Sequence, residues 1–91
     1  MLFDERVQLA IQFHKRGRLK EAGENYRSLL DVNAAHPDLN HNLGLIQRTF
    51  GEKDHARRHF AKAVLTNPQN AQYWKSYLTS LIDLNKTGEA R

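Results

Sequence analysis

The chain has 91 residues, of which 40% are hydrophobic and 26% are charged, a balance typical of a small folded domain and too apolar for a disordered segment. It contains no cysteine, which excludes disulfides, thiolate metal sites and thiol redox chemistry within it. The formal net charge is +4, but basic and acidic residues alternate along the chain instead of forming a block, so nucleic acid is not expected as a partner.

The apolar residues are spread along the chain in short groups. The N-terminus lacks the apolar run of a signal peptide, and no stretch approaches the roughly 20 apolar residues of a membrane span. We therefore expect no membrane partner and a cytoplasmic location.

Apolar residues recur at steps of three and four throughout, which is the spacing of amphipathic helices. Gly17 and Gly51 interrupt this pattern as turn residues, and Pro68 stops it. Pro37 suits the first turn of a helix, because its missing N–H would be unpaired there in any case. The predicted helices run approximately over residues 4–15, 19–33, 37–49, 53–66 and 71–83.

An internal repeat of 34 residues relates these helices to one another. The shift superposes Ala22 on Ala56 and Ala90, Tyr26 on Phe60, Gly17 on Gly51, Leu9 on Leu43 and Tyr77, and Asn33 on Asn67. It divides a single domain, residues 1–91, into units of approximately 3–36, 37–70 and 71–91. Because a sixth helix would only be starting at Gly88, we expect either a fragment of a longer array or a final face covered by a partner or a second copy.

The order of these residues resembles the tetratricopeptide repeat family. The middle unit carries the resemblance best, with Leu43-Gly44, Ala56, Phe60, Ala63 and Pro68 at the family's offsets. The resemblance implies an all-α fold, an α-α superhelix of helix-turn-helix pairs with five helices and about 2.5 repeats. It also implies a protein-protein interaction module, since members commonly bind a peptide in the concave groove lined by the first helix of each pair.

Small residues are expected where the two helices of a pair cross closely, as at Ala10, Gly44 and Ala56. Leu78 departs from this pattern at the position equivalent to Gly44, and Ala34 replaces the expected proline of the first unit. The sequences of the repeats are similar to those of the N-terminal repeat arrays of bacterial multidomain proteins such as O-linked N-acetylglucosaminyltransferases.

The resemblance also indicates which side chains face the groove. Gln8, Asn42 and Ser76 form one line of groups that could bond a peptide backbone, although they could equally be solvated polar residues of a helix face. The predicted binding residues are Gln8, Ile11, His41, Asn42, Leu45, Arg48, Lys75, Ser76 and Thr79, and the wider predicted face includes Val7, Asp38, Gln72 and Asp83. Of the carboxylate clamp by which some members grip chaperone tails, only Asn42 is present.

No catalytic or metal-binding motif stands out. His55 and His59 have a zinc-compatible spacing but lack a third ligand, and the arginines between them disfavour a cation. There is no phosphate loop, nucleophile elbow or plausible carboxylate pair. Trp74 and Tyr77 are better explained as packing residues than as a platform for bases. The chain is therefore expected to be no enzyme and to need no cofactor or metal.

Two alternatives to peptide binding remain open at the level of sequence. The first is self-association into a homo-oligomer through the exposed end of the incomplete array. The second is recruitment of substrates for a glycosyltransferase domain outside this chain.

Overall fold

Five α-helices and their short connections make up residues 1–86, the part of the chain that the computed structural model describes. No strand occurs within those residues, which confirms the predicted all-α, five-helix fold. The predicted sixth-helix start at Gly88, and Ala90 as a repeat position, lie outside the described residues. The helices are α1 (Phe3–Lys15), α2 (Leu19–Val32), α3 (Pro37–Thr49), α4 (Lys53–Thr66) and α5 (Ala71–Lys86).

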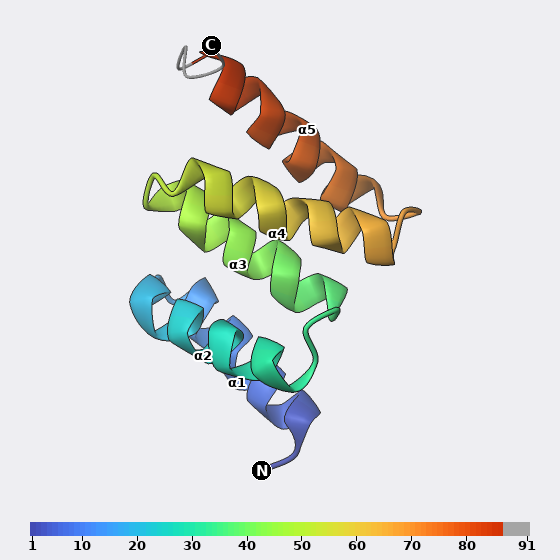
Figure 1. Ribbon diagram of the computed structural model, residues 1–91. Helices are drawn as coiled ribbons and strands as arrows, with labels where there is room; N and C mark the ends of the chain where they lie inside the picture. Colours follow the sequence, from blue (N-terminus) through green and yellow to red (C-terminus); the bar gives the residue numbers. More distant parts are fainter. Residues whose placement is uncertain (87–91) are drawn as a thin grey trace.

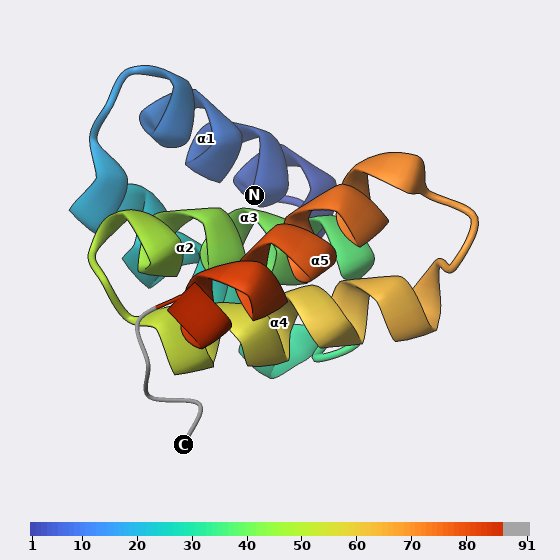
Figure 2. The same cartoon turned by 90° about the horizontal axis from the view of Figure 1, so that it is seen from above.

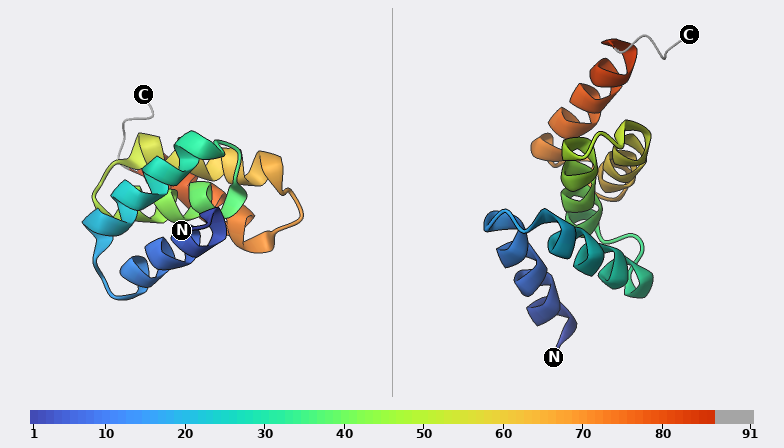
Figure 3. Two further views of the ribbon diagram at one scale, coloured as in Figure 1. Left: turned by 90° about the horizontal axis from the view of Figure 1, so that it is seen from below. Right: turned by 90° about the vertical axis from the view of Figure 1, so that its left-hand side faces the viewer.

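The helices form two antiparallel pairs and a single fifth helix (Figure 1). α3 is central, because it contacts α2, α4 and α5. α5 crosses α4 obliquely, as the view from above shows (Figure 2). Its C-terminal end extends away from the α3–α4 pair, which is clear in Figure 1 and in the right-hand view of Figure 3. The result is an elongated stack of 46 × 27 × 20 Å.

The turn within each pair depends on a glycine. Gly17 and Gly51 have φ angles of +78° and +81°, a left-handed conformation that residues with a Cβ rarely adopt. Each of these turns places the next helix back along the one before it. The predicted turn role of both glycines is confirmed.

The α2–α3 connection is held by a side chain that the sequence patterns did not single out. Asn40 is 1% exposed, and its Nδ2 donates to the backbone carbonyls of Ala34 and His36 at 3.0 Å each. Pro37 begins α3 immediately after His36, whose ring nitrogen accepts from the Leu39 N–H at 3.3 Å. These contacts order a connection in which Ala34 stands where the 34-residue repeat has Pro68.

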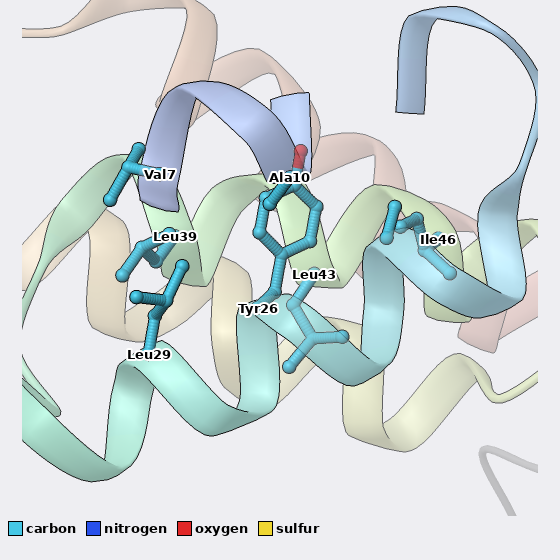
Figure 4. Packing of buried hydrophobic residues seen from close by; sticks show 8 residues of the cluster. Val7, Ala10, Tyr26, Leu29, Leu39, Leu43 and Ile46 are labelled. Carbon is cyan, nitrogen blue, oxygen red and sulfur yellow. The ribbon is translucent and has the colours of Figure 1, made fainter. Parts of the chain in front are cut away.

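The core lies where small side chains let the helices of a pair approach closely. Ala10, Ala22 and Ala56 are fully buried, and a Cβ on Gly44 would lie 2.6 Å from the Phe60 ring. Close crossing at these positions is therefore confirmed. Figure 4 shows the cluster between the first pair and α3, which contains Val7, Ala10, Tyr26, Leu29, Leu39, Leu43 and Ile46.

Equivalent apolar residues differ in exposure along the stack. Leu43 is 1% exposed because α3 has helices on both sides, whereas Leu9 of α1 is 41% exposed. On α5, Trp74, Leu78 and Ile82 are also exposed. One side of α5 is therefore apolar and open within the described part of the chain. Nowhere in residues 1–86 is a helix both long and apolar enough to cross a lipid bilayer.

Candidate functional site

A groove of about 260 Å³ lies between α3 and α5. It is lined by Leu45, Arg48, Gln72, Lys75, Ser76 and Thr79. Five of these six belong to the binding residues predicted from sequence, and Gln72 belongs to the wider predicted face. The structure thus brings together the α3 and α5 part of the predicted site.

Two side-chain hydrogen bonds join α3 to α5 within residues 1–86. The Tyr73 hydroxyl donates to the carboxylate of Asp38, and His41 Nε2 lies 2.7 Å from Ser76 Oγ. The His41 ring also lies against Tyr73 and Phe60, with ring centroids 5.0 and 5.6 Å away. These contacts fix α5 on α3 at one end of the groove.

Burial and hydrogen bonding shift the pKa values of this cluster. Burial lowers the pKa of His41, opposed by a hydrogen bond with Asn42 and by the charge of Asp38, while Arg48 and His14 lower it further. Burial raises the pKa of the Tyr73 hydroxyl, and its hydrogen bond to Asp38 acts in the same direction. A neutral His41 and a protonated Tyr73 are therefore the favoured forms near neutral pH.

The structure corrects the predicted polar line of Gln8, Asn42 and Ser76. Gln8 is exposed, but Asn42 is half-buried and Ser76 is only 5% exposed, with its hydroxyl on His41. His41, also predicted to face a ligand, is itself 6% exposed. The physical reason is the offset between α3 and α5. Both hydrogen bonds between them join residues 35 apart, one more than the repeat, so the Ser76 hydroxyl is engaged by His41 although the residue borders the groove.

The α1 part of the predicted site is separate from the groove. Gln8 is exposed on α1, whereas Ile11 is half-buried against the core of the first pair. Next to them, His14 Nδ1 lies 3.0 Å from the Tyr26 hydroxyl and ties α1 to α2. Burial lowers the pKa of His14 and raises that of Tyr26 to about 12. Neither Gln8 nor Ile11 lines the α3–α5 groove.

The charged lining of the groove is entirely basic. Arg48 is half-buried, with its guanidinium 5.8 Å from the centroid of the Phe60 ring, while Lys75 is exposed. Neither forms an ion pair with any residue of 1–86. The groove therefore offers two uncompensated positive charges beside Leu45 and Thr79.

Two histidines, His41 and His59, lie close to polar side chains and were considered for catalysis and for zinc binding. The 2.7 Å His41–Ser76 contact is the distance of a base and nucleophile, but Ser76 is only 5% exposed between α3 and α5. His59 Nδ1 is 2.8 Å from Gln47 Oε1, which engages one of the two histidines considered for zinc. No trio of metal-ligating side chains is found in the described residues.

No protein-family model matches the chain. The chain is similar to segments of cellulose synthase operon protein C. One protein of that name from Komagataeibacter xylinus is 31% identical over 75 residues, 82% of this chain. Cellulose synthase 1 operon protein C from the same organism is 30% identical over 74 residues, and a Komagataeibacter sucrofermentans protein is 29% identical over 65 residues. The chain spans about 6% of the length of the two Komagataeibacter xylinus proteins.

Proposed function

We propose that this chain is a protein-interaction module that binds an extended segment of a partner protein in the α3–α5 groove. The observation that carries the proposal is the convergence of five sequence-predicted binding residues on one groove of about 260 Å³. Half-buried Leu45 and Arg48 of α3 and exposed Gln72 and Lys75 of α5 line it, so a peptide could contact side chains on two sides. The helix-pair stack supplies the rigid surface that such binding needs.

The proposal also covers catalysis, cofactors, the larger protein and its location in the cell. The chain itself catalyses no reaction and needs no cofactor, and it acts as one segment of a larger protein whose other segments carry any further activity. A cytoplasmic location belongs to the proposal as well, and fractionation of cells that make the natural protein tests it.

The binding proposal is tested with selected peptides and groove variants. Peptides are selected on the immobilised chain from an unbiased display library, and their affinities are compared for the wild type, Arg48→Ala and Thr79→Trp. Both variants are expected to weaken binding at least about fivefold, one by removing a charged donor and the other by filling the groove. Arg58→Ala, an exposed change on α4, is the control. Selected peptides that bind all four proteins equally would refute the groove as the binding site.

Self-association is the second candidate function, because α5 exposes an apolar side. Leu78 is 50% exposed and Ile82 is 55% exposed, and Trp74 continues the same helix surface. A second copy that covered these residues would remove the apolar area from water. Light scattering over a wide concentration range tests this, and a monomer at every concentration would exclude it.

The names of the relatives provide a first set of partners to test. They are named for a cellulose synthase operon, so we propose the other products of such an operon as candidates for the groove. None of the relatives named above is called an O-linked N-acetylglucosaminyltransferase. The hypothesis that the chain recruits substrates for a glycosyltransferase is therefore supported only by the similarity of the repeat sequences.

A further inference from the structure

We infer that the α3–α5 groove selects acidic peptide segments, with a carboxylate side chain seated between Arg48 and Lys75. This inference rests on the proposed function, since it names the chemistry of the ligand for the same groove. Its basis is the distribution of charge around the groove, the support of the arginine and the length of the lining.

The charge of the groove is positive because the acids of both helices are placed elsewhere. Arg48 and Lys75 are the charged residues of the lining, and no acid is among its six residues. Asp38 is at the other end of α3, where its carboxylate accepts the Tyr73 hydroxyl. Asp83 lies about one helical turn beyond Thr79, outside the lining. A carboxylate entering the groove would thus meet two cations that have no competing partner in residues 1–86.

Arg48 is held in place before a ligand arrives. Its guanidinium lies over the fully buried Phe60 ring, and the side chain is already half-buried. Less side-chain entropy is lost on binding when a donor is held in this way. The planar guanidinium can then present two parallel N–H groups to one carboxylate, which a lysine cannot do.

The length of the lining limits the recognised segment to a few residues. Gln72 to Thr79 on α5 spans about 10 Å along the helix axis, which matches roughly three residues of extended peptide. Gln72 can both donate to and accept from a peptide backbone, and Leu45 offers an apolar contact. The geometry therefore favours a short acidic motif within an extended partner segment.

The probes are short fluorescein-labelled peptides that alternate alanine with glutamate, glutamine or lysine, measured by fluorescence anisotropy. The wild type is expected to bind the glutamate peptide roughly tenfold more tightly than the glutamine peptide. Arg48→Gln and Lys75→Gln should each weaken that binding about fivefold. Lys20→Gln and Lys62→Gln are the matched controls, because each removes one positive charge from an exposed position, on α2 and on α4 respectively. Each should change the affinity for the glutamate peptide less than about twofold.

A charge reversal keeps the test independent of any folding defect at Arg48. Lys75→Glu lies on the exposed surface of α5 and should shift the preference from the glutamate peptide toward the lysine peptide. Equal losses in the groove and control variants, or equal binding of glutamate and glutamine peptides, would overturn the inference. If the two peptides bind equally but Thr79→Trp abolishes both, acid selection fails while groove binding stands. If neither these probes nor any library-selected peptide is sensitive to Thr79→Trp, the proposed function fails as well.

Discussion

Gly44→Ala should destabilise the chain through a single added methyl group. Its Cβ would lie 2.6 Å from Phe60 Cε1 and 2.8 Å from Cδ1, and the Phe60 ring is fully buried. Overpacking of this kind costs about 1–3 kcal/mol, while exchanging glycine for alanine inside a helix returns up to about 1 kcal/mol. The net loss should be about 1–2 kcal/mol, or roughly 4–16 °C in Tm for a chain of this size.

Gly23→Ala provides the control with the opposite expected sign. A Cβ at this position would meet Ile46 Cγ2 at 3.6 Å and Arg27 Nη1 at 3.9 Å, both ordinary contacts. The helix-propensity gain should then dominate, with stability rising by about 0.5–1 kcal/mol. Urea unfolding followed by circular dichroism measures both variants, with the m-value as a check on two-state behaviour. A neutral or stabilising Gly44→Ala would refute the close α3–α4 crossing.

The other stability predictions concern the turns, the α3–α5 contact and pH. Gly51→Ala should cost about 1 kcal/mol, because its φ of +81° strains any residue with a Cβ although nothing crowds the site. Ser76→Ala should cost about 1–2 kcal/mol in urea unfolding, because it leaves the buried His41 ring nitrogen without its partner. Burial lowers the pKa of His14, His41 and His59 in the folded chain. The unfolded state therefore binds protons first on acidification, so Tm should be constant above about pH 7 and fall as pH drops below the ordinary histidine pKa of about 6.5.

Further variants check the α3–α5 contact and the pH dependence. Ser80→Ala removes another buried hydroxyl of α5 but leaves the His41–Ser76 hydrogen bond in place, so it should cost less than Ser76→Ala. His41→Gln should flatten part of the acid-side fall in Tm, because burial lowers the pKa of His41 in the folded chain. A Tm that rises on acidification would contradict the burial of these histidines, and a Gly51→Ala chain as stable as wild type would contradict the left-handed turn.

The helices and their crossings could be predicted because each depends on local signals that recur in the sequence. Turn glycines at Gly17 and Gly51 and the alanines at the crossings determine local backbone and packing, and the repeat shows each signal more than once. The role of Asn40 could not be predicted in this way. Its two hydrogen bonds replace a missing proline at one connection only, so no repeat of the pattern indicates them.

The groove could be predicted in part, for a related reason. Register predicted one face for Leu45, Arg48 and Thr79, and these three residues line the same groove. It could not show that His41 and Ser76 would bond each other, because that depends on an offset of 35 residues between α3 and α5. A helix-to-helix offset is set by the packing of bulky side chains in three dimensions, and a sequence period of 34 does not contain it.

The most direct test of groove binding uses the fact that the chain has no cysteine of its own. Thr79→Cys and, as a control on α2, Lys20→Cys are each labelled with a photoactivatable crosslinker and mixed with the library-selected peptides. The label at Thr79 should crosslink to the peptides, while the label at Lys20 should not. Efficient crosslinking at Lys20 with none at Thr79 would place the binding surface elsewhere and contradict the account.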